Sequence, residues 1–168
     1  KFGLDFETVH KIFNSRWRYP NLEISGVHVH IGSQIMDATP FENAIKKVLD
    51  FLRANRIDVE YFNIGGGLGI IYSIENPQTA KSFAGKVLPL LRKSGLKIIL
   101  EPGRFVSGNS GVLITRVIYA KRTPRKKFLI VDSGMSDLIR PSLYEAYHKI
   151  VPVAVAENSS ETAEKTDV

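Results

Sequence analysis

Three short runs of apolar and β-branched residues, separated by helical patterns, constrain the fold of this chain more than any other feature. The runs cover about residues 26–31, residues 59–64 and the segment that leads into LEPGR. Between them, in residues 39–55 and 79–94, apolar side chains recur every three or four positions. Because strands joined by such helices pair in parallel through right-handed crossovers, the pattern predicts βαβ units and a parallel sheet, open or closed.

The helical segments carry recognisable end signals. Asp5 is the expected N-cap of a first helix over 5–17. Thr39, with Glu42 three residues later, forms a capping box that predicts the start of the next helix. Pro89 is expected to bend the last of these helices or to delay its start, because proline lacks the N–H and crowds the preceding turn.

The pattern changes near residue 110. The segments GVLITRVIYAKR, KFLIVDSG and HKIVPVAVA are strand-like and are joined by turns, so an all-β segment is predicted to follow the α/β part. We therefore expect two domains, at 1–109 and 110–168, with a polar loop or tail over 157–168. The basic run AKRTPRKK at 120–127 fits a solvated hairpin turn better than a nucleic-acid patch.

Composition excludes several classes of protein. The 168 residues are 43% hydrophobic and 24% charged, which is typical of a soluble globular chain. The net charge of +6 is moderate and could serve anionic small molecules or an acidic partner surface, and we expect neither nucleic acid nor membrane as a partner. No run reaches the roughly 18 apolar residues of a membrane span, and KFGLDFETVH does not resemble a signal peptide. The absence of cysteine excludes disulfides, thiolate zinc sites and a cysteine nucleophile within the chain.

Unusual residues follow each of the three predicted strands. The motifs are HVHIGSQ, NIGGGLG and EPGR. Because the carboxyl ends of neighbouring parallel strands open onto one crevice, we expect these motifs to share one site.

The glycines admit two interpretations. Successive glycine N–H groups can wrap an anionic group such as a phosphate without a Cβ clash. A tight turn that needs positive φ is the alternative. No Lys-Ser/Thr pair follows the glycines, which argues against a P-loop.

The polar side chains of the other two motifs are equally open to more than one role. His28 and His30 lie two residues apart on a strand and so share a face, the spacing of a barrel metallohydrolase site, although hydrogen-bonded core histidines have the same pattern. Glu101 and Arg104 could pair with each other at the strand end. Alternatively, Glu101 could bind a protonated ring nitrogen and Arg104 a phosphate or carboxylate.

Taken in order, HVHIGSQ, NIGGGLG, EPGRFVSGNSG and VDSGMSDLIRPSLY resemble the alanine-racemase-like, fold type III pyridoxal-phosphate decarboxylases. The resemblance extends over residues 1 to about 153. It implies the C-terminal part of a (β/α)8 TIM-type barrel followed by part of an all-β domain, and it implies pyridoxal 5'-phosphate as cofactor with no metal.

The resemblance also implies roles for individual residues. Two catalytic residues are expected, His30 against the cofactor ring and Glu101 at the pyridinium nitrogen. The phosphate would be held by Ser33 and by the amides of Gly65, Gly66 and Gly67, with Gly103 and Arg104 in the cofactor site and Arg104 reaching the substrate. The distal carboxylate of the substrate would be bound by Arg140 and Tyr144.

The activity implied is decarboxylation of meso-2,6-diaminopimelate to L-lysine in lysine biosynthesis, by a cytoplasmic homodimer. Arginine or carboxynorspermidine decarboxylases are the near alternatives, and a non-catalytic decarboxylase-like binding protein is a more distant one. A metal-dependent barrel hydrolase that uses His28 and His30 remains the alternative from a different class.

Two features of the family pattern are absent from this sequence. The Schiff-base lysine of these enzymes lies in a motif of the type Tyr-Ala-x-Lys-Ala, which does not occur here, and the later Cys-Glu pair is also missing. We therefore expect an internal segment of such an enzyme, without catalytic activity on its own.

Overall fold

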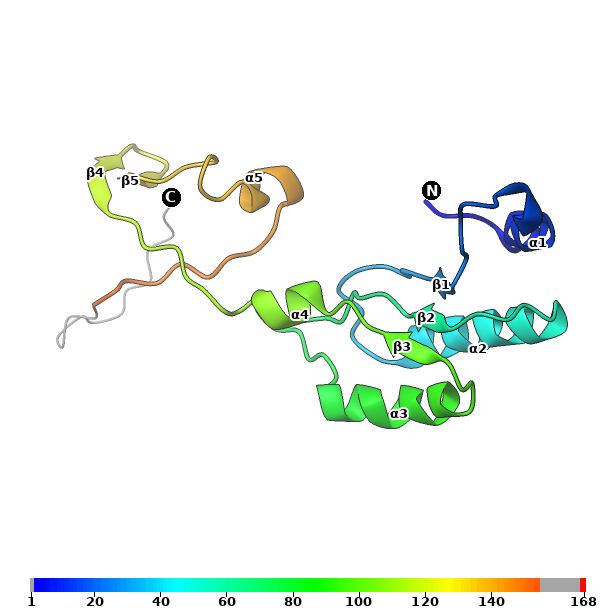
Figure 1. Ribbon diagram of the computed structural model, residues 1–168. Helices are drawn as coiled ribbons and strands as arrows, with labels where there is room; N and C mark the ends of the chain where they lie inside the picture. Colours follow the sequence, from blue (N-terminus) through cyan, green and yellow to red (C-terminus); the bar gives the residue numbers. More distant parts are fainter. Residues whose placement is uncertain (1, 155–166) are drawn as a thin grey trace. The chain divides into compact units, whose positions relative to one another are not determined.

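The computed structural model describes residues 2–154 and 167–168, and the chain divides into two compact units. The first unit comprises Lys1–Ile71 and Glu75–Ser110, and the second comprises Tyr72–Ile74 and Gly111–Val168. A parallel sheet and the longer helices belong to the first unit, whereas the second contains an antiparallel hairpin (Figure 1).

The sheet of the first unit has three parallel strands in the order β1-β2-β3, which confirms the predicted βαβ arrangement. The strands are β1 (Gly26–His28), β2 (Tyr61–Asn63) and β3 (Lys97–Ile99). In the register of the sheet, Asn63 lies between His28 and Ile99. Since neighbouring side chains on a strand point to opposite faces, His28 and Asn63 share one face while Val27 and Phe62 share the other.

Backbone pairing continues beyond the three residues of each strand. The N–H of Val29 donates to the carbonyl of Asn63 at 3.0 Å, and the N–H of Glu101 donates to that of Gly65 at 2.9 Å. The chain segments that follow the strands therefore stay side by side, although the regular strands are shorter than the sequence predicts.

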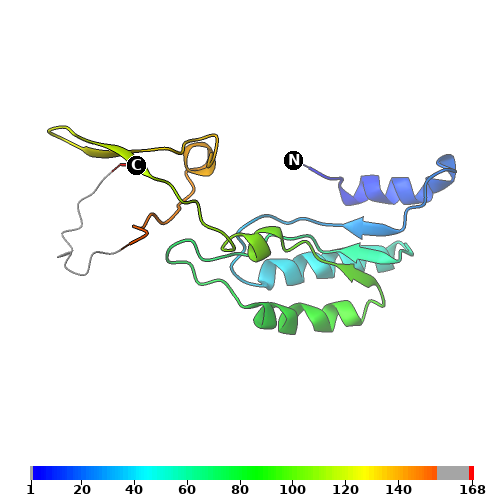
Figure 2. The same cartoon turned by 60° about the vertical axis from the view of Figure 1, so that its left-hand side comes forward.

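Helices α2 (Thr39–Ala54) and α3 (Ala80–Arg92) pack against each other and lie on the same side of the sheet (Figure 2). Their apolar stripes and the inward face of β2 form the core, in which Phe62 is fully buried and Phe41 meets Phe83 edge to face at 5.0 Å. Burial of each such side chain contributes about 1.5–3 kcal/mol. The other buried helical residues are Ile45, Val48, Leu52, Val87 and Leu91.

Helix α1 (Phe6–Asn14) precedes the sheet and ends earlier than predicted, since a 3-10 turn, η1 (Arg16–Arg18), follows it. The Asp5 cap is confirmed, because its carboxylate accepts from the N–H of Thr8 at 2.7 Å. Phe6 stacks on Phe51 of α2 with ring centroids 4.6 Å apart, which joins the two helices.

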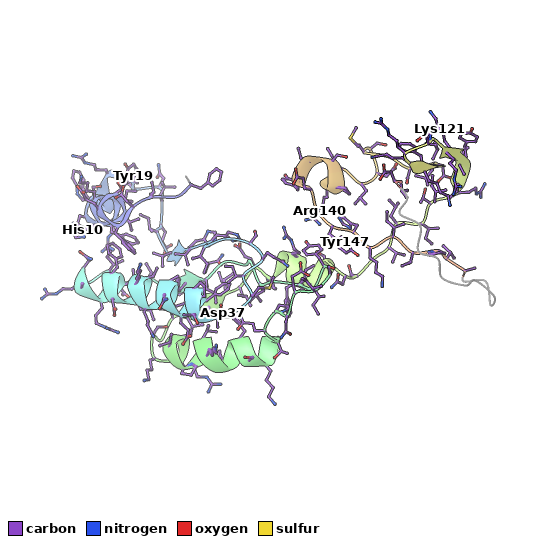
Figure 3. All side chains as sticks on the ribbon, turned by 180° about the vertical axis from the view of Figure 1, so that it is seen from behind. His10, Tyr19, Asp37, Lys121, Arg140 and Tyr147 are labelled. Atoms are coloured by element: carbon purple, nitrogen blue, oxygen red, sulfur yellow. The ribbon has the colours of Figure 1, made fainter. Side chains whose placement is uncertain are left out.

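The capping box predicted for α2 is wrong, and so is a start of α3 delayed by Pro89, whereas the start of α3 near residue 79 is as predicted. Helix α2 has Ala38 as its N-cap, so the Thr39 capping box does not form. The carboxylate of Asp37, which Figure 3 labels, accepts from the Thr39 N–H at 2.8 Å instead. Helix α3 starts at Ala80, capped by Thr79, and runs through Pro89 rather than starting after it. The apolar face of α3 is buried on both sides of the proline, which offsets the lost hydrogen bond.

The third strand forms where the apolar run before LEPGR predicts it, but all three residues of β3 are exposed, because β3 is the outer strand of the three in this chain. A short helix, α4 (Gly103–Ser107), begins directly after EP.

The second unit is built on a hairpin of β4 (Val117–Arg122) and β5 (Lys127–Val131). The basic run extends from the end of β4 through the turn to the start of β5, and the Thr123 N–H donates to the carbonyl of Lys126 at 2.8 Å, which confirms the predicted hairpin. The one-turn helix α5 (Arg140–Tyr144) follows. Residues 148–154 form no strand, contrary to prediction, and the rest of HKIVPVAVA lies outside the described residues. Among the described residues, no helix has the length and hydrophobicity needed to cross a membrane.

Candidate functional site

The structure brings the ends of the three strands into direct contact. A Cβ added to Gly65 would lie 2.3 Å from the carbonyl oxygen of Val29, and one added to Gly66 would lie 1.9 Å from that of Glu101. A Cβ on Gly67 would lie 2.0 Å from the carbonyl oxygen of Gly32. The glycine turn is therefore enclosed by the two neighbouring motifs, and only glycine permits this approach.

Backbone conformation adds a second requirement for glycine. Gly65 and Gly67 have φ values of +72° and +96°, which side-chain-bearing residues rarely adopt. The tight-turn interpretation of NIGGGLG is therefore correct for the backbone. It does not exclude anion binding, because a turn of this kind also exposes N–H groups.

The loop after β1 runs along the glycine loop. The Ile35 N–H donates to the carbonyl of Gly67 at 2.9 Å, and the Gln34 side-chain amide donates to the carbonyl of Ile70 at 2.6 Å. These bonds place Ser33 next to Gly67, since a Cβ on Gly67 would be 3.5 Å from the Ser33 Cα.

The N–H groups of the three glycines are not equivalent. The Gly65 N–H is used by the Asn63 side chain at 2.9 Å, and the Gly66 N–H makes a long contact of 3.4 Å with Nδ1 of His30. In the part of the chain that the structure describes, neither the Gly67 N–H nor the Ser33 hydroxyl has a protein hydrogen-bond partner. Two adjacent donors therefore remain for an anionic oxygen at this end of the site.

The Glu101 carboxylate lies at the other end of the cluster. Its Oε1 accepts from the side-chain amide of Asn63 at 2.7 Å, and its Oε2 is 3.6 Å from Nε2 of His28. About half of the side-chain area of Glu101 and of His28 is exposed. The contacts of the Glu101 carboxylate with Asn63 and His28 connect it to β2 and β1.

His28, His30 and Glu101 also form the one group of potential metal ligands within residues 2–154 and 167–168. Each offers a ligand atom, and these atoms lie within 4.8 Å of one another. Two imidazoles and a carboxylate could bind a divalent transition metal. Geometry alone thus leaves a metal site and a cofactor site open at the same position.

The remaining predicted residues lie at two places. Gly103 and Arg104 begin α4, and the Gly103 N–H donates to the carbonyl of Glu101 at 2.9 Å, so both are close to the cluster in the chain. Arg140 and Tyr144 lie on α5 of the second unit. There the Arg140 guanidinium donates to the Tyr72 hydroxyl at 3.3 Å and lies over its ring.

Sequence reasoning missed Asn63 and Tyr72. Asn63 could have been found, because it is the polar residue directly before the glycines and its strand position places it on the same face as His28. Tyr72 carries no comparable signal, since it lies 68 residues from Arg140.

Comparison with known proteins favours a cofactor site over a metal site. Residues 1–108 match the family described as pyridoxal-dependent decarboxylase, pyridoxal binding domain. The chain belongs to this family. The match confirms the resemblance seen in the sequence, and the cofactor of the family is pyridoxal 5'-phosphate.

Related decarboxylases resemble nearly the whole chain. A diaminopimelate decarboxylase of Aquifex aeolicus is 45% identical over 168 residues, which cover 98% of this chain and 40% of the relative. That of Vibrio cholerae is 38% identical over 166 residues, which cover 96% and 40% of the two proteins. The chain spans about 40% of the length of the curated relatives it matches.

Solved structures agree with these sequence comparisons. Diaminopimelate decarboxylase from Helicobacter pylori, in complex with L-lysine, has a TM-score of 0.83 and 40% identity over 93% of this chain and 40% of its own. The enzyme from M. jannaschii, also with L-lysine, has a TM-score of 0.80 and 38% identity over 89% and 37% of the two chains. A lysine/ornithine decarboxylase of Vibrio vulnificus shares the fold at 19% identity and a TM-score of 0.78. The predicted fold class, part of a TIM-type barrel followed by part of a β-domain, is confirmed.

Proposed function

We propose that the protein containing this chain converts meso-2,6-diaminopimelate to L-lysine and carbon dioxide with pyridoxal 5'-phosphate. The observation that carries the proposal is the convergence of His30, Ser33, the glycine turn and Glu101 at one end of a parallel sheet, in a chain of the pyridoxal-dependent decarboxylase family. The choice of substrate follows from relatives of 38–45% identity that are named diaminopimelate decarboxylase.

The residues present fit this cofactor. The free Gly67 N–H and the adjacent Ser33 hydroxyl suit a phosphate group, with Gly65 and Gly66 shaping the turn beside them. At the other end, the Glu101 carboxylate suits a protonated ring nitrogen, because an ionic partner stabilises that proton. An acceptor and a phosphate-binding turn at the same end of the sheet match the two polar ends of this group.

When bound, the cofactor supplies an electron sink for the negative charge that remains on Cα as carbon dioxide leaves. His30 would provide a flat surface against the ring, and Glu101 would hold the proton on the ring nitrogen. Gly103 and Arg104 would complete the phosphate end, with the Arg104 guanidinium also within reach of the substrate carboxylate.

Recognition of the substrate is assigned to the second unit. Diaminopimelate carries a second amino acid centre, so a specific enzyme needs a receptor for the distal carboxylate. We assign this role to Arg140 and Tyr144, because a guanidinium binds a carboxylate in fork geometry and a phenol adds a further donor. Arginine or carboxynorspermidine decarboxylation is the alternative that lacks this receptor.

The experiment that tests the proposal uses the complete protein. Purified holoenzyme is incubated with meso-2,6-diaminopimelate, L-arginine and L-ornithine, and carbon dioxide and L-lysine are measured. We expect release of both from diaminopimelate alone. Bound metal, with no cofactor absorbance and no release of carbon dioxide, would favour the hydrolase that uses His28 and His30 instead.

We also propose that the complete protein is a cytoplasmic homodimer. The support is the family resemblance and the biosynthetic role of the relatives' named activity. Light scattering of the complete protein measures the oligomer, and fractionation of cells that express it measures the location.

A further inference from the structure

Asn63 joins the two ends of the candidate cofactor site. It is the last residue of β2, and its side chain accepts from the Gly65 N–H at 2.9 Å and donates to Oε1 of Glu101 at 2.7 Å. The sequence separation between Asn63 and Glu101 is 38 residues, so this contact connects two different strand ends.

The orientation of the Asn63 amide follows from its two partners. The Gly65 N–H can only donate, so it requires the amide oxygen. The amide NH₂ is then directed to Glu101, whose carboxylate accepts. A flipped amide would place two donors together on one side and two acceptors on the other, and both bonds would be lost.

We propose that Asn63 is a positioning residue that sets the Glu101 carboxylate in register with the phosphate-binding turn. With Oε1 bound by Asn63, the other oxygen of Glu101 is held beside His28, and the carboxylate cannot rotate freely. This inference rests on the proposed cofactor site. It adds that one side chain, Asn63, aligns the phosphate-binding turn with the Glu101 carboxylate.

A purely local role is the competing explanation. An asparagine that accepts from the N–H two residues later forms an Asx-turn, which stabilises a tight turn without any ligand. Asn63→Asp separates the two roles, because an aspartate keeps the acceptor for Gly65 but removes the donor to Glu101. Asn63→Leu removes both.

Binding to the cofactor-free complete protein is the measurement. The affinity for inorganic phosphate measures the phosphate-binding turn alone. The affinity for pyridoxal 5'-phosphate depends on both the turn and the Glu101 carboxylate. We expect Asn63→Asp to keep phosphate affinity within about twofold and to weaken cofactor binding about tenfold or more, the range for a lost hydrogen bond to a charged group. Asn63→Leu should weaken both ligands.

Acidification gives a second, more specific signature. In the Asn63→Asp variant two carboxyl groups would lie at hydrogen-bond distance, and such a pair shares one proton readily. Cofactor affinity of this variant should therefore recover as the pH is lowered, because the shared proton restores a donor to Glu101. Asn63→Leu should show no such recovery.

Asn14→Asp is the matched control, since Asn14 is an exposed residue on α1 whose side-chain amide lies 2.8 Å from Nε2 of His10. It should leave both affinities unchanged. Cofactor binding by Asn63→Asp at wild-type strength and with the wild-type pH profile would overturn the proposal and leave Asn63 an Asx-turn residue. An equal loss in Asn14→Asp would also overturn it, by assigning the effect to net charge.

The measurement does not need turnover. If the wild-type protein binds the cofactor but does not decarboxylate diaminopimelate, the substrate proposal fails and the Asn63 result stands. If the wild-type protein does not bind the cofactor, both proposals fail. Melting temperatures of all variants show whether Asn63→Leu is folded. If it is not, Asn63→Asp alone tests the proposal.

Discussion

At the scale of single residues, the site is defined by which polar groups are already used within the chain. Glu101 has one oxygen bonded to Asn63 and the other near His28, while the Gly67 N–H is free among the described residues. The carboxylate is thus restrained by an amide hydrogen bond and a histidine contact. A restrained anionic acceptor is what a protonated ring nitrogen requires.

Glu101→Gln tests the electrostatic role of this residue. In the complete enzyme the variant should retain cofactor, because a neutral amide still fills the site, but it does not hold the ring nitrogen protonated. We expect kcat to fall about 10²-fold or more, which is the usual effect of removing one preorganised electrostatic partner. Steady-state kinetics and the absorbance of bound cofactor are measured together. Wild-type turnover in Glu101→Gln would remove Glu101 from the catalytic assignment.

The glycine turn makes a prediction about stability as well as binding. Gly66→Ala should lower the melting temperature and weaken cofactor binding, because its Cβ would lie 1.9 Å from the Glu101 carbonyl oxygen, which belongs to rigid backbone. Overpacking of this kind costs about 1–3 kcal/mol. Gly69→Ala should have a smaller effect, since its nearest atom is Sδ of the flexible Met36 side chain at 2.9 Å.

Gly85→Ala is the matched control for the glycine turn. Gly85 lies on α3, and a Cβ there meets nothing within 4 Å. Alanine should stabilise the helix by about 0.5–1 kcal/mol. Equal melting temperatures for Gly66→Ala and Gly85→Ala would contradict the packing shown for the turn.

At the scale of helices and strands, the sequence predicts what depends on local pattern and misses what depends on neighbours. The period of apolar residues predicts α2 and α3, and the crossover rule predicts a parallel sheet. The pattern cannot show that β3 lies at an edge, because a strand that is apolar on both faces looks the same in either position. The N-cap of α2 is Ala38 and not Thr39, because the side chain of Asp37, which is also a good capping residue, accepts from the Thr39 N–H.

Asp132, directly after β5, is expected to make the stability of the second unit sensitive to acid. Its carboxylate accepts from the N–H of Arg116 and from the Thr115 hydroxyl, both at 2.8 Å. The hydrogen bond from the Arg116 backbone, followed by that from Thr115, lowers the pKa of Asp132. A lowered folded pKa stabilises the folded state fully above the unfolded value of about 3.9, and the contribution is lost as the pH falls through the folded pKa.

Asp132→Asn should therefore reduce the melting temperature near neutral pH and flatten its decrease on acidification. Melting curves of the complete protein between about pH 2 and pH 7 measure both effects. Thr115→Val, which removes one of the two bonds, should give an intermediate profile. An unchanged acid profile in Asp132→Asn would mean that these bonds contribute nothing to stability.

At the scale of the whole molecule, the proposed chemistry is divided between two units. The residues assigned to the cofactor lie in Lys1–Ile71 and Glu75–Ser110, and those assigned to the distal carboxylate lie in the second unit. The sequence predicts the first group from strand-end geometry, because parallel strands bring their ends together. For Arg140 and Tyr144 only the family resemblance predicts a role, since no rule of local structure relates a one-turn helix to a site so distant in the chain.

Arg140→Met tests whether this division holds. The substrate carboxylate would lose a charge-assisted partner, which is worth about 1.5–3 kcal/mol, so KM for diaminopimelate should rise about 10- to 150-fold while cofactor binding stays unchanged. Activity on an amino acid without a distal carboxylate, such as arginine, should be unchanged or slightly higher, because nothing charged is left unpaired.

Tyr72→Phe is the control: it removes the 3.3 Å hydrogen bond to Arg140 but keeps the ring beneath the guanidinium. If Arg140→Met lowers activity on both substrates equally and Tyr72→Phe does the same, Arg140 stabilises the second unit, and the substrate is then an unspecified basic amino acid.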